Sequence, residues 1–81
     1  MGKLRIMTHQ GDRTVTWDEA KAKIGDPEAL KAIREAERLF EMERANGATA
    51  FSVTPDSPPV KLHDFDKAAE QIVMVPRIAG G

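Results

Sequence analysis

The alternation of apolar and polar residues near the start of the chain predicts two strands, over residues 4–8 and 13–17. The side chains expected to share the inner faces of these strands are Leu4 and Ile6 in the first and Val15 and Trp17 in the second. Between the strands lies His9-Gln10-Gly11-Asp12, which contains a glycine and fits a turn. The chain should therefore open with a hairpin, and Trp17 should be a core or rim residue.

A long amphipathic helix is the clearest element of the sequence. Asp26 is a good N-cap, Pro27 suits the first helical position, and Asn46-Gly47 should end the helix. Placed at 100° intervals, the residues of the apolar face are Ala29, Ala32, Ile33, Ala36, Leu39 and Phe40. This face should pack on a sheet. The preceding residues 18–25 form either a short helix capped by an aspartate or an irregular connection.

The second half of the chain contains shorter elements separated by turn-forming residues. A third strand is expected over residues 48–53, followed by a loop over 54–59, because prolines cannot serve a central ladder. Residues 60–63 can form a short edge strand. Residues 64–70 should make a turn or a single helical turn, with Phe65 tucked under it into the core.

The last apolar run, Ile72 to Val75, predicts a strand that is buried on both faces, since a half-buried strand would alternate. As the most apolar strand, it should lie in the middle of the sheet, next to the first strand. Pro76 has no N–H for a ladder and should end the strand. We therefore divide the chain into a domain over residues 1–75 and a flexible tail over 76–81, which ends in Gly-Gly.

The expected order is strand, strand, helix, strand, strand, strand, with one long helix on one face of a mixed sheet. This is an α+β protein with the β-grasp arrangement. The ending Pro76-Arg77-Ile78-Ala79-Gly80-Gly81 resembles the Pro-x-Val-Ala-Gly-Gly ending of the small sulfur-carrier proteins of thiamin and molybdopterin biosynthesis. Those proteins are β-grasp relatives of ubiquitin.

The resemblance implies a carrier or modifier protein rather than an enzyme. A partner enzyme would use ATP to convert the Gly81 carboxylate into an acyl-adenylate, which a sulfur donor or an acceptor protein would then attack. Gly80 and Gly81 lack a Cβ and would fit a narrow site. The expected partner-binding tail consists of Pro76, Arg77 as a recognition handle, Ile78 as an anchor, and Ala79. The chain itself would need no cofactor and would be a monomer when free.

A second interpretation makes the Gly-Gly end incidental. The chain would then be a non-covalent interaction or structural protein, for example a phage or accessory component, that uses its sheet or helix surface. The two interpretations differ in whether function requires a free Gly81 carboxylate.

The amino-acid composition argues against several classes of function. With 12 basic and 13 acidic residues and a net charge of -1, the chain lacks the basic footprint of a nucleic-acid-binding protein. It has no cysteine, which excludes a disulfide framework, a thiolate zinc site and a cysteine nucleophile. No apolar run approaches the roughly 20 residues that span a bilayer, and no signal peptide is apparent. We therefore expect a cytoplasmic protein without a membrane partner.

The sequence gives only weak evidence for a metal site or for a pair of catalytic side chains. The possible metal ligands are His9, His63, Asp64 and Asp66. The two histidines lie in unrelated loops without helical ligand spacing, so we expect them to be surface residues. Glu37 and Glu41 are carboxylates one turn apart on the charged side of the helix, where no pocket is evident. We therefore expect no metal site and no catalytic residue.

Overall fold

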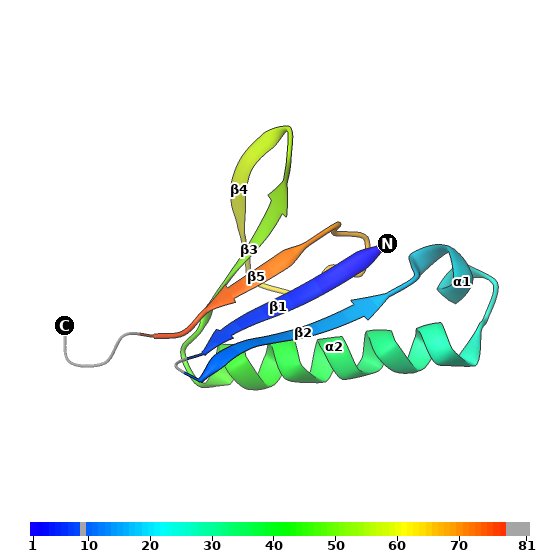
Figure 1. Cartoon of the computed structure of the whole chain (residues 1–81), viewed down its shortest axis with the longest axis horizontal. Helices are drawn as coiled ribbons and strands as arrows, with labels where there is room; N and C mark the ends of the chain where they lie inside the picture. The colour runs from blue at the N-terminus through cyan, green and yellow to red at the C-terminus, as the bar shows by residue number, and fades with distance from the viewer. Residues whose placement is uncertain (9, 78–81) are drawn as a thin grey trace.

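Within residues 1–8 and 10–77, which the computed structural model describes, five strands form one mixed sheet in the order β2-β1-β5-β3-β4 (Figure 1). The elements are β1 (Gly2–Thr8), β2 (Gly11–Trp17), α1 (Glu19–Lys23), α2 (Pro27–Ala45), β3 (Thr49–Thr54), β4 (Ser57–Leu62) and β5 (Ile72–Val75). β1 and β5 are parallel, whereas the other neighbouring pairs are antiparallel. With α2 packed on one face, this is an α+β fold of β-grasp-like topology, and the fold prediction is confirmed.

The opening hairpin is longer than the sequence pattern predicted. Thr8 pairs with Gly11, so β2 begins two residues earlier than predicted, inside the segment expected to be the turn. β1 begins at Gly2 instead of Leu4. Gly11 has φ +120°, a conformation that favours glycine, and the Thr8 hydroxyl donates a hydrogen bond to the Gly11 carbonyl. The predicted faces are confirmed, because the side chains directed to the core are Leu4, Ile6 and Trp17, with Val15 half-buried beside them.

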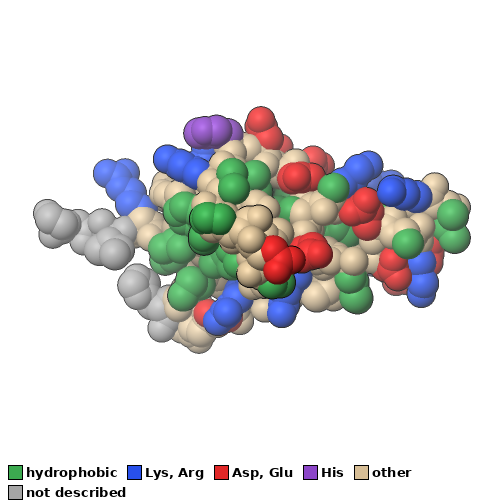
Figure 2. Space-filling view, turned by 90° about the horizontal axis from the view of Figure 1, so that it is seen from above, with side chains coloured by type: hydrophobic (Ala, Val, Ile, Leu, Met, Phe, Trp, Pro, Cys, Tyr) green, Lys and Arg blue, Asp and Glu red, His purple; other side chains and the backbone are tan. Residues whose placement is uncertain are grey.

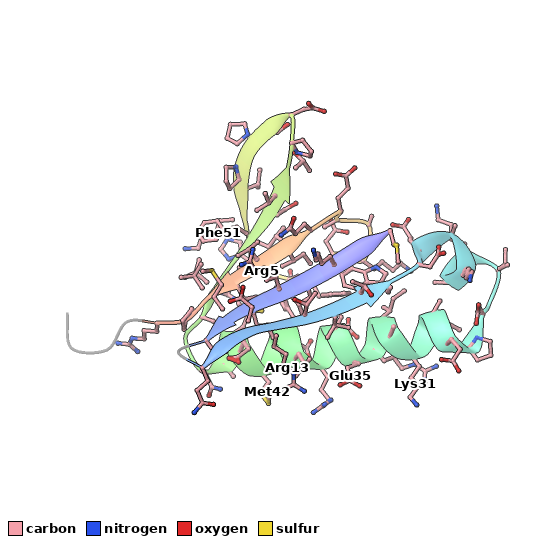
Figure 3. The ribbon with its side chains drawn as sticks, viewed as in Figure 1. Arg5, Arg13, Lys31, Glu35, Met42 and Phe51 are labelled. Atoms are coloured by element: carbon pink, nitrogen blue, oxygen red, sulfur yellow. The ribbon has the colours of Figure 1, made fainter. Side chains whose placement is uncertain are left out.

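Both helices begin at the aspartates that the sequence indicated as caps. Asp18 accepts a hydrogen bond from the Lys21 N–H (3.2 Å), so the short helix α1 does form. Asp26 accepts from the Glu28 N–H (3.0 Å), and α2 ends at Asn46 as predicted. Lys31, Glu35 and the exposed Met42 lie on the outer side of α2 and point away from the sheet (Figure 3).

The core lies between α2 and the sheet. Its largest fully buried side chains are Trp17, Phe40, Leu4, Leu39, Ile72 and Met74. Burying each such side chain stabilises the fold by about 1.5–3 kcal/mol. Ala29, Ala36 and Ala50 are also buried, and side chains this small let the helix approach the sheet closely.

An aromatic cluster fixes the segment between β4 and β5 over the core. Phe65 packs against Trp17, with ring centroids 5.4 Å apart, and against Phe40, at 5.8 Å. The Trp17 Nε1–H donates to the Lys67 carbonyl (3.0 Å), and the Asp66 carboxylate accepts from the Ala68 N–H (2.9 Å). The predicted insertion of Phe65 is confirmed, and the segment around it is a turn rather than a helix.

The prediction of a proline-rich loop over residues 54–59 is wrong, because the observed turn is shorter. The turn comprises only Pro55 and Asp56, and β4 already begins at Ser57. Pro58 and Pro59 are tolerated because β4 lies at the edge of the sheet, where one side of the backbone has no neighbouring strand to bond. A register shift between Ser52 and Thr54 accommodates the end of the hairpin.

The prediction that β5 is buried on both faces is also wrong. Ile72 and Met74 face α2 and are fully buried, but Val73 is half-buried and Val75 is 37% exposed. The central position of the strand, between β1 and β3, is confirmed. The error arises because α2 covers one face of the sheet, and a run of apolar residues does not reveal whether a second layer covers the other.

None of the helices in the described part of the chain has the length and apolar character needed to cross a membrane.

Replacing Gly2 by alanine should destabilise the protein. A Cβ at this position would lie 2.1 Å from Cε2 of the buried Trp17 indole, so the ring or the strand must move. Overpacking of this kind typically costs about 1–3 kcal/mol. We expect the urea midpoint of Gly2→Ala, followed by tryptophan fluorescence, to fall accordingly.

The neighbouring Lys3 is exposed and provides the control. Lys3→Ala should change the unfolding free energy by less than about 0.5 kcal/mol. Equal midpoints for Gly2→Ala and Lys3→Ala would contradict the close packing of Trp17 on Gly2.

Candidate functional site

The predicted tail continues from the strand at the centre of the sheet. β5 pairs with β1 through Leu4↔Ile72 to Ile6↔Met74 and with β3 through Thr49↔Val75 to Ser52↔Ile72. Hydrogen bonding on both sides holds this strand in place up to the point where the tail begins. After Val75 the chain leaves the ladder, as expected from the missing N–H of Pro76.

Arg77 packs against the end of the long helix. Gly47, with φ +95°, follows the C-cap Asn46, and its N–H donates to the Arg44 carbonyl (3.0 Å). A Cβ added to Gly47 would lie 3.0 Å from Cδ and 3.4 Å from Cβ of Arg77, so the aliphatic part of Arg77 covers this glycine. The basic side chain therefore lies near the carbonyl end of α2, where the helix dipole favours a cation.

The structure describes only part of the predicted partner-binding tail. Pro76 is half-buried and Arg77 is exposed. The remaining predicted site residues, Ile78, Ala79, Gly80 and Gly81, lie outside the described residues. The assignment of the activated C-terminus to Gly80 and Gly81 therefore stays a prediction, as does the division between domain and tail.

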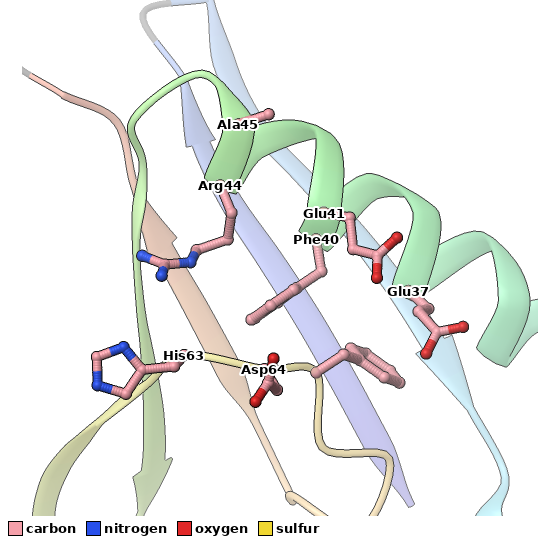
Figure 4. A pocket seen from close by; sticks show the side chains of 8 residues that line it. Glu37, Phe40, Glu41, Arg44, Ala45, His63 and Asp64 are labelled. Atoms are coloured by element: carbon pink, nitrogen blue, oxygen red, sulfur yellow. The ribbon is translucent and has the colours of Figure 1, made fainter.

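A hollow lies beside the glutamates for which the sequence suggested no pocket. It has a volume of about 440 Å³ and is lined by Glu37, Phe40, Glu41, Arg44, Ala45, His63, Asp64 and Phe65 (Figure 4). The loop after β4 folds back over the C-terminal half of α2, and sequence spacing gives no sign of this approach. The expectation that no pocket accompanies Glu37 and Glu41 is therefore wrong.

The hollow does not have the arrangement of a metal centre. His63 lies at the opposite side of the hollow from the two glutamates (Figure 4). Among residues 1–8 and 10–77, no group of three or more histidine, cysteine, aspartate or glutamate side chains is placed to hold a metal ion. His9, the other histidine considered as a ligand, falls outside the described residues.

The sheet face opposite α2 is a second candidate, for which the sequence analysis named a sheet surface but none of its residues. Cross-strand pairing places Arg5 beside Val73, Val73 beside Phe51, and Phe51 beside Lys61. Phe51 and Val73 are half-buried, and Lys61 is exposed. The strands contain more apolar residues than one long helix can cover. This excess was the sign in the sequence that some apolar side chains would lie on the other face of the sheet.

Hydrophobic side chains gather left of centre in the space-filling view, with Lys or Arg side chains on two sides of them (Figure 2). We call the row formed by Arg5, Val73, Phe51 and Lys61 the open-face row. It combines an apolar centre with a basic group at each end.

Comparisons with protein-family models, with curated proteins and with solved structures find no match for this chain.

Gly47→Ala should be destabilised by about 1–2 kcal/mol, because alanine is strained in a left-handed conformation. Gly47→Asn should lose less stability, since asparagine tolerates this conformation better. Both unfolding free energies can be measured by urea denaturation. A Gly47→Ala protein as stable as the wild type would contradict the role of Gly47 as the residue that ends α2.

Proposed function

We propose that this chain is a small carrier or modifier protein whose Gly81 carboxylate is adenylated by a partner enzyme and then carries sulfur or is joined to a target protein. The observation that carries the proposal is the continuity between β5 and the tail. A central strand of a β-grasp-like sheet runs directly into Pro76-Arg77 and then into the sequence Ile78-Ala79-Gly80-Gly81.

The anchoring of β5 supports this function. A carrier must present its carboxylate to a separate enzyme without unfolding. β5 is bonded to β1 and β3, and Ile72 and Met74 are fully buried. Partner binding to the tail would therefore act on a strand that is paired on both sides, and Pro76 prevents the ladder from continuing into the tail.

The chemistry of the ending also supports it. One oxygen of the Gly81 carboxylate would attack the α-phosphorus of ATP, and the bond to pyrophosphate would break to give an acyl-adenylate. A hydrosulfide donor would then add to the carbonyl carbon, lose its proton and displace AMP to leave a thiocarboxylate. A cysteine thiol would displace AMP in the same way to give a thioester, which an acceptor amine would then open to form an amide and release the thiol. A Cβ on either of the last two residues would hinder the approach of the backbone to the nucleotide.

The partners in this proposal are an adenylating enzyme, which uses ATP, and a sulfur donor or an acceptor protein. The chain supplies the carboxylate and the recognition surface and performs no catalysis itself. A reducing cytoplasmic location would suit a thiocarboxylate, and a sequence without cysteine is compatible with it.

The intact mass of the protein isolated from its native cell tests the proposal. We expect a fraction of the wild-type chain to show exchange of one oxygen for sulfur, or to be attached to another protein. Both signals should be lost when Gly80 and Gly81 are deleted, and also when a single alanine follows Gly81, because each change removes the Gly81 carboxylate.

Ile24→Ala provides a matched control, because Ile24 is 84% exposed at the end of α1, and α1 lies at the opposite end of the sheet from the carboxyl end of β5 (Figure 1). This variant should keep both signals. An unmodified mass, combined with full function of the chain lacking Gly80 and Gly81, would contradict the proposal and favour a non-covalent interaction protein.

A further inference from the structure

The open-face row crosses four strands in a single line of side chains. Arg5 of β1 is the partner of Val73 of β5, Val73 is the partner of Phe51 of β3, and Phe51 is the partner of Lys61 of β4. Because paired residues in a sheet project from the same face, these four side chains lie next to one another. The row is fixed by backbone pairing in the centre of the sheet.

The apolar part of the row borders a shallow hollow. Phe51, Val53, Pro59 and Val73 line it, with a volume of about 260 Å³. These residues come from β3, β4 and β5, so the hollow lies where the β3–β4 hairpin leaves the body of the sheet (Figure 1). A space of this size and lining fits one or two apolar side chains of a partner better than an extended ligand.

The charged groups at the two ends of the row are basic, whereas Glu70 lies on the side of Val53, with which it lines a neighbouring hollow. Strand alternation places Lys3, Arg5 and Lys61 on this face, together with Asp12, whose Oδ2 accepts from Arg5 Nε (2.8 Å). The whole chain has a net charge of -1, so the basic groups at the ends of the row do not reflect an excess of basic residues in the molecule as a whole. The complementary surface is apolar with carboxylates at its border.

We propose that the open-face row is a docking site for a partner protein that places an apolar side chain in the hollow lined by Val73 and Phe51 and carboxylates beside Arg5 and Lys61. This inference holds whether or not Gly81 is activated. Arg5 is well suited to the role because its guanidinium has donors beyond those that Asp12 takes.

The same charges argue against two other occupants. Anionic membranes are held by clusters of about four to eight basic residues, more than this face provides. A second copy of the chain packed face to face would bring like charges together around the same apolar centre, which is unfavourable. The occupant of the open-face row that we propose is therefore an acidic surface of a partner protein.

The test is an NMR titration of the full ¹⁵N-labelled chain with a blocked synthetic peptide in which one leucine is flanked on each side by two glutamates. We expect shift changes centred on the amides of Val73, Phe51 and their strand neighbours. We also expect weaker binding as salt is raised. A peptide with lysines in place of the glutamates should bind at least tenfold more weakly.

Two double variants make the test specific. Arg5→Gln/Lys61→Gln should weaken binding of the acidic peptide about tenfold. Lys31→Gln/Arg34→Gln makes the same charge change on exposed positions of α2, which packs on the other face, and should leave binding unchanged. Retained dispersion of the amide spectrum will show that each variant is folded.

Several results would overturn the inference. These are no shift changes along the row at millimolar peptide, equal binding of the acidic and basic peptides, or equal weakening by the two double variants. Binding to phosphatidylserine vesicles without binding to the acidic peptide would assign the face to a membrane. Concentration-dependent shifts on this face without peptide would assign it to a second copy of the chain.

Discussion

The fold depends on the parallel pairing of its first and last strands. β1 and β5 are joined through Leu4↔Ile72 and Ile6↔Met74, and all four of these side chains are buried against α2. This pair brings the first and last strands of the chain side by side at the centre of the sheet. The hairpin β1–β2 is then positioned on one side and the hairpin β3–β4 on the other. Because parallel strands require a long connection, α2 crosses over this pair and forms the second layer of the core.

Much of this architecture can be derived from local signals. The caps Asp18 and Asp26 carry their own side-chain acceptors, so they mark the helix starts whatever the rest of the chain does. The strict alternation of Leu4 and Ile6 assigns the inner face of β1 in the same way. The apolar face of α2 follows from its helical period, and its four buried residues are Ala29, Ala36, Leu39 and Phe40. These predictions are correct because each depends on residues close together in sequence.

The errors concern properties that only tertiary arrangement decides. Pro58 and Pro59 are acceptable in β4 because this strand lies at an edge, and their local sequence does not contain that information. The apolar run in β5 could not show that only one of its faces is covered. The hollow beside Glu37 and Glu41 likewise arises from a loop that is distant in sequence. Of the candidate site, the residue pattern predicts the tail, and this stays a prediction. The residues of the row on the sheet could not be predicted, because the sequence does not give the cross-strand register.

The parallel β1–β5 pair also has a mechanical consequence. Force applied through the tail, against resistance at the amino end of β1, pulls two neighbouring parallel strands in opposite directions along their length. The hydrogen bonds between them are then loaded together in shear, whereas a hairpin pulled from its open end separates one bond at a time. The same central pairing that positions the tail would therefore make the sheet resist traction on it, and a partner could pull on the end of the chain without stripping β5 from the sheet.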